Sequence, residues 1–308
     1  MQTCIIFNPR AGSATQIETL HSAIAQRPET QLLETAAAGD AQRLAETALD
    51  AGCKRLIAAG GDGTAHEVAN AILARKADAV LGILPLGTGN DLSRTLQIPI
   101  DLADALRLLD TGVERRISAI KVVAERRICY CINVAAGGFS GQIDEALTDE
   151  MKQTWGPLAY LRGAIKVIPD LTHYRTLIRF DGSPREPITA LNIIIANCRT
   201  AGGGTEVAPM ADPQDRVLDV VIVRPGSFTE LAAVAARLLA GDYTGSDLVC
   251  HRTARRVEIE STPGMWFNVD GELLTNRPIT FSIIPDALRV LTHATYTSTN
   301  ANAITSAT

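Results

Sequence analysis

Glycine-rich polar loops follow several apolar runs in this 308-residue chain, and they carry the residues best suited to chemistry. The most informative loop, residues 60–64, reads Gly-Gly-Asp-Gly-Thr and stands between a predicted strand and a predicted helix. Glycine lets the backbone turn sharply and approach a ligand without a Cβ atom in the way. The helix N-terminus that follows points unpaired N–H groups at an anion. The spacing is neither a Walker A loop nor a G-x-G-x-x-G fingerprint. It predicts another kind of phosphate-binding turn, with a generic glycine turn as the alternative.

Two further loops of small residues also leave predicted strands. Residues 8–12 read Asn-Pro-Arg-Ala-Gly, and residues 84–91 read Leu-Pro-Leu-Gly-Thr-Gly-Asn-Asp. The carboxyl ends of parallel strands meet at one edge of a sheet, where α/β proteins bind their ligands. Together, the loops predict a nucleotide cradle.

The elements that must position these loops change in character near residue 115. Before it, predicted strands at 3–7, 31–34, 55–59 and 80–84 alternate with predicted helices at 13–26 and 40–51 and after residue 64. This alternation predicts a parallel sheet with helices on both faces. After it, strand-like segments dominate at 117–123, 128–134, 176–180, 188–196, 218–223, 256–261, 266–269, 279–283 and 288–291, with helical stretches at 158–168 and 229–239. That pattern favours an antiparallel sandwich or barrel. We therefore expect a nucleotide-binding α/β domain over 1–115, a β-rich substrate and metal domain over 116–294, and a disordered tail over 295–308.

Composition excludes several classes of protein. Apolar residues make up 46% and charged residues 20%, as in globular domains, and the formal net charge of −5 disfavours nucleic acid as a partner. The N-terminus lacks the features of a secretory signal, and no apolar stretch is long enough for a transmembrane helix. The six cysteines are scattered without metal-binding spacing, which predicts reduced thiols and a cytoplasmic protein.

The ordered set of motifs resembles the catalytic-domain family of diacylglycerol kinases and sphingosine kinases, most closely its soluble bacterial lipid-kinase branch. The resemblance rests on residues 8–12, 60–64 and 85–91 and continues through Asn133, Gly137-Gly138-Phe139, Asn197, Gly202–Gly204, Pro209, 212–223 and 269–272. It implies a Rossmann-like α/β domain of the NAD kinase and phosphofructokinase type, followed by an antiparallel β-sandwich. It also implies transfer of the γ-phosphoryl group of ATP to a lipid hydroxyl, with the nucleotide bound between the domains.

The family pattern assigns roles to positions of this chain. The ATP site that it implies comprises Asn8, Gly12, Thr35, Gly60, Gly61, Asp62, Gly63, Thr64, Ala65, His66 and Thr88. Asp62 is also a catalytic candidate, because loop carboxylates beside a triphosphate usually act through Mg²⁺; a helix-capping aspartate is the alternative. Glu272 matches the proposed general base, although its Asp-Gly-Glu context is also typical of a solvated hairpin turn. Asp270 would organise the cleft or a metal.

A second, structural Mg²⁺ site would use Asp212, Asp215 and the carbonyl of Val217. Two departures from the family pattern bear on the sites: Arg216 stands where glycine is usual, and His66 where asparagine is common. A guanidinium beside the structural site would weaken metal binding or replace the ion.

Basic clusters in the sequence bear on membrane contact, and two other functions stay open. The lipid substrate is expected at a membrane surface, reached by transient peripheral association through basic clusters at 115–116, 126–127 and 252–256, which are otherwise solvated strand ends. The acceptor is diacylglycerol-like, phosphatidylglycerol-like or sphingoid. The sequence does not determine the oligomeric state, and a homodimer stays open. The alternatives are a kinase of a soluble substrate, as in NAD kinases, and a catalytically silent nucleotide-sensing module.

Overall fold

The computed structural model of the chain describes residues 3–138, 171–241 and 243–296. It divides into two compact units: residues 1–119, 213–215 and 285–308 form the first, and residues 120–212 and 216–284 form the second. The chain therefore passes between the units more than once, and strands β5 (Val113–Ala124) and β18 (Ile279–Thr292) each contribute to both. The sequence predicted a boundary near residue 115, and the domain limits given above remain a prediction.

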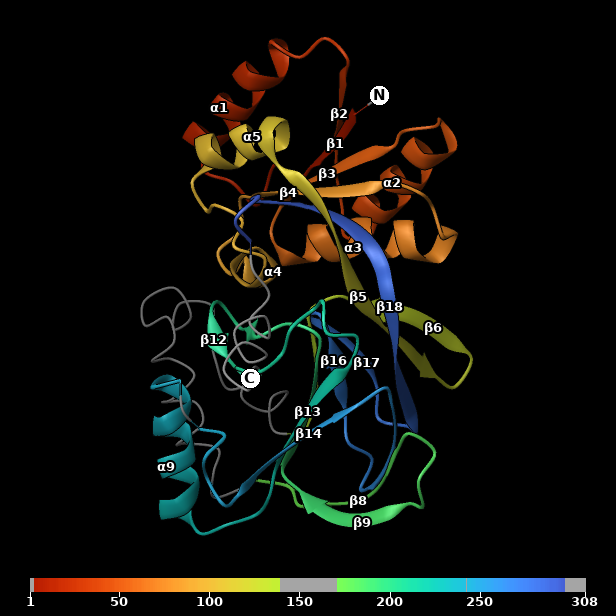
Figure 1. Cartoon of the computed structure of the whole chain (residues 1–308), viewed down its shortest axis with the longest axis vertical. Helices are drawn as coiled ribbons and strands as arrows, with labels where there is room; N and C mark the ends of the chain where they lie inside the picture. The colour runs from red at the N-terminus through yellow and green to blue at the C-terminus, as the bar shows by residue number, and fades with distance from the viewer. Residues whose placement is uncertain (1–2, 139–170, 242, 297–308) are drawn as a thin grey trace, which may run out of the picture. The chain divides into compact units, whose positions relative to one another are not determined.

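The first unit is a parallel α/β layer. Its strands lie in the order β2-β1-β3-β4, and the end of β18 pairs in parallel with β4. Helices cover both faces, with α1 and α5 on one and α2 and α3 on the other (Figure 1). The bounds are β1 Thr3–Phe7, α1 Ala14–Ala25, β2 Thr30–Glu34, α2 Asp40–Asp50, β3 Arg55–Gly60, α3 Asp62–Arg75, β4 Val80–Pro85, α4 Asp91–Thr95 and α5 Leu102–Thr111.

Side-chain alternation explains this layering. Ile5 and Phe7 of β1 belong to one apolar cluster with Leu20 of α1 and Leu106 of α5. Because successive strand residues point to opposite faces, the intervening Ile6 points to the face of α2 and α3. Both faces of the strand are buried, so it reads as a continuous apolar run.

The second unit is an antiparallel sandwich. One sheet contains β9, β8, β15 and the first part of β18, with the β5–β6 hairpin, and the other has the order β14-β13-β10-β7-β16-β17. Ile178, Val257 and Phe281 from the first sheet share a buried cluster with Ile193 and Phe267 from the second. The remaining bounds are β6 Arg127–Cys131, β7 Val134–Gly138, β8 Tyr174–Phe180, β9 Glu186–Ala190, β10 Asn192–Ala196, β11 Thr200–Ala201, β12 Thr205–Glu206, β13 Leu218–Val223, α9 Phe228–Leu239, β14 Val249–Ala254, β15 Arg256–Thr262, β16 Phe267–Val269 and β17 Glu272–Thr275.

Three predicted strand boundaries are wrong. The apolar runs at 128–134 and 188–196 are each two strands, because the chain leaves one sheet after β6 or β9 and enters the other as β7 or β10. The runs at 279–283 and 288–291 are one strand, β18, in which Asp286 takes a φ of 52° without ending the strand. Strands β14 and β17 were not predicted. The predicted helix at 158–168 and most of the predicted tail lie outside the described residues.

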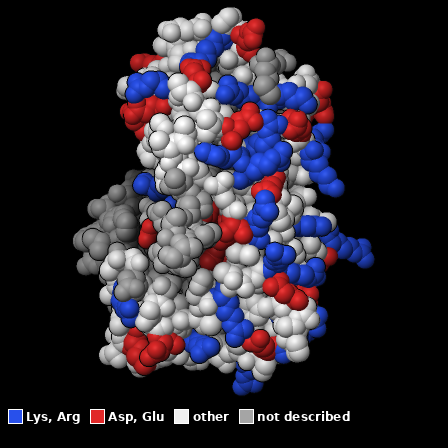
Figure 2. Space-filling view, viewed as in Figure 1, with Lys and Arg blue, Asp and Glu red and all other residues white. Residues whose placement is uncertain are grey.

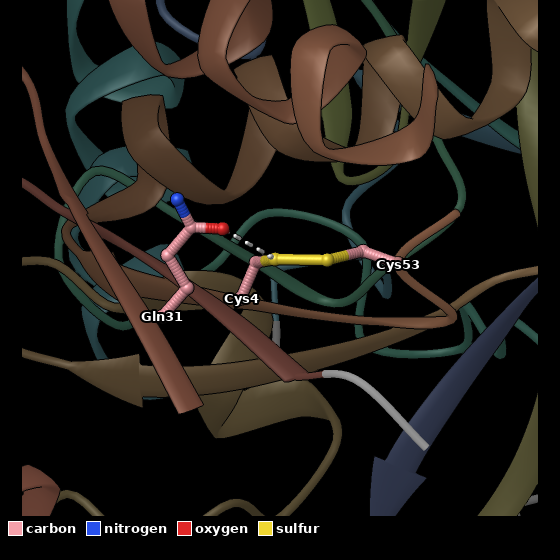
Figure 3. Close-up of a disulfide and its surroundings, with 3 residues drawn as sticks. All are labelled: Cys4, Gln31 and Cys53. Atoms are coloured by element: carbon pink, nitrogen blue, oxygen red, sulfur yellow. Dashed lines mark hydrogen bonds between the residues drawn. A yellow bond between two sulfur atoms is a disulfide. The ribbon is translucent and has the colours of Figure 1, made fainter. Parts of the chain in front are cut away.

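The prediction that all six cysteines are reduced is also wrong. Cys4 and Cys53 form a disulfide with a Cα–Cα distance of 6.5 Å, while the other four cysteines, all within the described ranges, are thiols outside any disulfide (Figure 3). Cys4 lies on β1 and Cys53 just before β3, and these strands pair directly. The spacing of 49 residues in the sequence gives no hint of this proximity, because the parallel pairing of β1 with β3 creates it.

Candidate functional site

The predicted nucleotide loops of the first unit lie at one edge of its sheet. The backbone amide of Thr35 donates to β1, that of Asn8 donates to β3, and that of Leu86 donates to Gly60, each at 2.9 Å. These bonds continue the parallel ladder just past the strand ends. The structure therefore brings together the loops that follow β1, β3 and β4, as the sequence predicted, and the loop after β2, which begins at Thr35, lies at the same edge.

Two of these loops touch backbone to backbone. A Cβ atom on Gly87 would lie 2.5 Å from the Cα atom of Gly61, closer than real Cβ atoms approach any neighbour. A Cβ atom on Gly60 would lie 2.7 Å from that of Thr64. Glycine at positions 60 and 87 is therefore a packing requirement of the fold itself.

Gly63 is different, because a Cβ atom there would meet no atom of the described residues within 4 Å. It belongs to the first turn of α3, a 14-residue helix whose N-cap, Gly61, makes no side-chain capping bond. The first N–H groups of such a helix lack intrahelical partners and attract anions. The open space at Gly63 allows a ligand to approach this end of the helix.

Asp62 braces the two glycine loops. Its Oδ1 atom accepts the backbone N–H of Leu92 at 3.3 Å, at the start of α4. Burial raises the pKa of the Asp62 carboxyl, and the nearby Asp91 carboxylate raises it further. Carboxylate oxygens are the ligands that Mg²⁺ prefers, so both side chains are of the chemical type that such an ion would use.

The remaining predicted ATP-site residues occupy varied environments. The side-chain Oδ1 atom of Asn8 accepts the backbone N–H of Arg10 at 3.0 Å, which closes the turn after β1. His66 is buried on α3 beside Asn70, whose side-chain amide donates to the His66 carbonyl at 3.0 Å. Ala65 is buried, Gly12 is half-buried and Thr88 is exposed.

Sequence reasoning missed Glu67, on α3. Its carboxylate accepts the backbone N–H groups of Gly39, Ala41 and Gln42 at 3.0, 2.9 and 3.3 Å. These groups form the N-terminus of α2, where the sequence predicted Asp40 as the cap. The N-cap is instead Gly39, which has no side chain, so the acceptor comes from another helix. Glu67 thereby links α3 to the loop that contains Thr35.

In the second unit, Glu272 follows a two-residue hairpin turn formed by Asp270 and Gly271. It is the first residue of β17, is exposed, and pairs with Val269 of β16. Burial raises the pKa of Cys129 to about 11, and the charges of Asp270 and Glu272 add to the rise. The Cys129 thiol thus lies within electrostatic range of both carboxylates.

The predicted structural-metal residues are divided between the units. Asp212, which is buried, and Val217 belong to the second unit, and Asp215 belongs to the first. Arg216 has a φ of 65°, in the left-handed region that favours glycine. This backbone conformation explains why glycine suits the position. Within the described ranges, no group of three or more His, Cys, Asp or Glu side chains is arranged to hold a metal ion.

The basic clusters are partly neutralised. Arg252 forms a salt bridge with Glu186 at 3.0 Å, and Arg256 forms one with Glu258 at 3.1 Å. The guanidinium of Arg116 donates to the carbonyl of Asp286. Basic side chains are interspersed with acidic ones on the face drawn in Figure 2.

The fold and the loops define a two-part α/β and β-sandwich architecture, and comparison with known proteins identifies its family. The diacylglycerol kinase catalytic domain model matches residues 2–122, and the YegS C-terminal NAD kinase beta sandwich-like domain model matches residues 133–292. The protein named "Probable lipid kinase YegS-like" of Pseudomonas fluorescens is 36% identical over 85% of this chain and 85% of its own length. Its namesake in Pseudomonas aeruginosa PAO1 is 35% identical over 82% of this chain and 81% of its own length. The chain therefore belongs to the YegS-like, diacylglycerol kinase-related family of lipid kinases.

Solved structures show the same fold. A chain described as a diacylglycerol kinase from Bacillus anthracis str. Sterne superposes with a TM-score of 0.73 at 20% identity, covering 96% of this chain and 98% of that one. A second chain from that organism gives a TM-score of 0.82 at 22% identity, covering 96% of each chain. The predicted family, the predicted fold and the assignment as a kinase that acts on an alcohol group are confirmed, and the family implies ATP as phosphoryl donor. Among the described helices, none is long and apolar enough to span a membrane.

Proposed function

We propose that this lipid kinase transfers the γ-phosphoryl group of ATP to a lipid hydroxyl with the help of Mg²⁺. The convergence of the loops after β1, β2, β3 and β4 at one sheet edge carries the proposal. Such an edge, with an uncapped helix N-terminus and open space at Gly63, suits a polyphosphate. The relatives described above are named as lipid kinases, which supports a lipid as acceptor.

Each proposed role follows from the chemistry of the residue. Glu272 accepts the proton of the acceptor hydroxyl, whose oxygen then attacks the γ-phosphorus while the bond to the leaving ADP breaks. The exposed position of Glu272 at the start of an edge strand leaves its carboxylate accessible to a substrate. Asp62 would hold Mg²⁺ beside the triphosphate, and the ion would neutralise charge on the phosphate oxygens. Asp212, Asp215 and Val217 are proposed to hold a second ion.

The acceptor is proposed to be diacylglycerol-like, phosphatidylglycerol-like or sphingoid, presented at a membrane during transient peripheral contact. Arg126, on the turn between β5 and β6, and Arg127, the first residue of β6, are both exposed and support contact with an anionic bilayer. Sedimentation with vesicles of anionic or neutral lipid tests this contact. Equal binding to both kinds of vesicle would contradict the electrostatic component.

The proposal is tested with [γ-³²P]ATP and micelles containing dioleoylglycerol, sphingosine or phosphatidylglycerol, beside NAD and buffer alone. Label in one of the lipids, dependent on Mg²⁺ and lost in Glu272→Gln, is the expected result. Label in NAD but in no lipid would establish the soluble-substrate alternative. Tight ATP binding without any transfer would establish the nucleotide-sensing one.

A further inference from the structure

The carboxylate of Asp270 is fully engaged by the chain. It accepts the backbone N–H groups of Ile132, Asn133 and Val134 at 2.7, 3.0 and 3.0 Å, and the thiol of Cys131 at 3.1 Å. Consecutive backbone N–H groups turned toward one point form a cradle for negative charge. Here the cradle is the junction between β6 and β7, and the anion it holds is a side chain of the same protein. The Asp270 carboxylate therefore has fixed partners within the chain.

This anchor lies in the turn that delivers Glu272. Asp270 and Gly271 have φ values of 48° and 100°, as a two-residue type I′ turn requires. The Asp270 amide donates to Val134 at 3.1 Å, and the Gly271 amide donates to the side chain of Asn268 at 2.7 Å. The turn is thus held through both the backbone and the side chain of Asp270.

The strand that carries Glu272 needs such an anchor. Among the described strands, β17 pairs only with β16, and the register of that pair shifts between Phe267 and Asn268. An edge strand with one short, irregular neighbour has little backbone pairing to fix its position. The turn at Asp270 supplies the fixed point, two residues before Glu272.

The cradle is itself braced from a third segment. The side-chain amide of Asn197 donates to the Ile132 carbonyl at 2.9 Å, and that of Asn133 donates to the Thr200 carbonyl at 2.9 Å. The backbone of Cys198 donates to the Asn133 carbonyl at 3.2 Å. The β6–β7 junction is therefore bonded to the segment 197–200 as well as to the hairpin.

We propose that Asp270 is a positioning residue that fixes Glu272 by binding the hairpin turn to the cradle at residues 131–134. The inference rests on the proposed role of Glu272 as general base. Charge-assisted bonds to several N–H donors are stronger than neutral ones. An amide in place of the carboxylate would present N–H₂ to donors, which breaks part of the cradle and leaves buried N–H groups without acceptors.

The chain provides a matched control at another hairpin. Asp181 has a φ of 48°, is followed by Gly182, and accepts the backbone N–H groups of Arg255 and Arg256 at 2.8 and 2.7 Å. It therefore anchors the β8–β9 turn in the same way, but no proposed catalytic residue follows it. Asp181→Asn reports what the loss of a turn anchor does to the fold alone.

The experiment compares Asp270→Asn, Asp181→Asn, Glu272→Gln and the double variant Asp270→Asn/Glu272→Gln. Turnover and both KM values are measured on the micelle lipid that the wild type phosphorylates, ATP affinity by calorimetry, and Tm by thermal unfolding. Displacing a reacting group by about 1 Å costs on the order of 100-fold. We expect Asp270→Asn to lower kcat by roughly 10- to 100-fold with KM values and ATP affinity within about twofold. Asp181→Asn is expected to lower Tm without this loss of kcat.

The double variant tests whether Asp270 acts through Glu272. Once Glu272 has lost its basicity, its position no longer matters, so Asp270→Asn is expected to cost no further turnover in that background. Losses that multiply would overturn the inference while leaving the proposed base intact. Wild-type turnover in Glu272→Gln would instead refute the proposed base, and the inference with it.

If Asp270→Asn does not fold, the milder substitution Asp270→Glu takes its place. Asp270→Glu keeps the charge and the acceptors but adds one methylene between the turn and the cradle. It is expected to fold and to lower kcat, again without further effect in the Glu272→Gln background. Full turnover in Asp270→Glu would show that the bonds between Asp270 and the cradle do not set the position of Glu272. An equal loss of kcat in Asp181→Asn would show the same.

Discussion

Gly63 and Gly60 allow ligand binding to be separated from packing within one loop. Both belong to the same five-residue motif, but a methyl group at Gly63 meets open space, whereas one at Gly60 meets the side chain of Thr64 at 2.7 Å. We therefore predict opposite effects for Gly63→Ala and Gly60→Ala. The first should impair nucleotide binding and spare the fold, and the second should destabilise the fold.

The magnitudes follow from these environments. Alanine is favoured over glycine by up to about 1 kcal/mol inside a helix, so Gly63→Ala in the first turn of α3 should raise the free energy of unfolding by roughly 0.5 kcal/mol. Overpacking at Gly60 should lower it by about 1–3 kcal/mol. If phosphates approach the backbone at Gly63, the added methyl group should weaken ATP binding at least tenfold, or about 1.4 kcal/mol.

Urea denaturation of each variant measures the stability change, and calorimetric titration with ATP and Mg²⁺ measures the affinity. A Gly63→Ala variant with wild-type ATP affinity would refute the reasoning, because the methyl group would then occupy space that no ligand uses. A Gly63→Ala variant that is less stable than the wild type would refute the prediction about stability, since no described residue lies within 4 Å of that methyl group.

Three further predictions concern buried or bridging groups. Glu67→Ala should lower the free energy of unfolding by about 1–3 kcal/mol, because the N–H groups that begin α2 lose their acceptor; the denaturation midpoint measures this, and an unchanged midpoint contradicts it. Asp62→Asn should stabilise the fold at pH 7 while reducing transfer. The pKa of Asp62 is raised in the folded state, so its ionisation opposes folding above the unfolded value of 3.8, and the advantage of asparagine should vanish as the pH falls below that value. Reduction of Cys4–Cys53 should cost up to about 4 kcal/mol for a separation of 49 residues, and alkylation of unfolded, unreduced protein should label four thiols rather than six.

The sequence predicted best where local chemistry decides the structure. Ser13 caps α1 through a capping box with Gln16, and both helix ends fall where the pattern placed them. The α/β alternation of the first unit was equally clear, because β1, β3 and β4 are apolar and buried, and loops of small residues precede α1, α2 and α3. In both cases the determining interactions lie within a few residues of one another.

Prediction failed where segments distant in the sequence determine the local structure. The run at 188–196 is mostly apolar, yet it is two strands, because its first part belongs to one sheet of the sandwich and its second part to the other. No local signal marks Leu191, the buried residue at which the chain changes sheets. Glu67 was missed for a related reason, since its partners lie 25–28 residues earlier and are all backbone groups. A better signal was the glycine at the N-cap of α2, which leaves a helix end that needs an acceptor from elsewhere.

The two Asp-Gly hairpins show how far a motif can specify a site. Asp181-Gly182 and Asp270-Gly271 adopt the same left-handed turn, and both aspartates accept backbone N–H groups of a neighbouring segment. Local sequence therefore fixes the turn in both places, but it does not say which segment the carboxylate binds. The tertiary fold makes that difference, because it brings the β6–β7 junction to one hairpin and the start of β15 to the other. A glutamate after an Asp-Gly turn becomes a candidate base only where the turn is anchored beside the residues of a site, and that condition lies in the packing of the sandwich rather than in the motif.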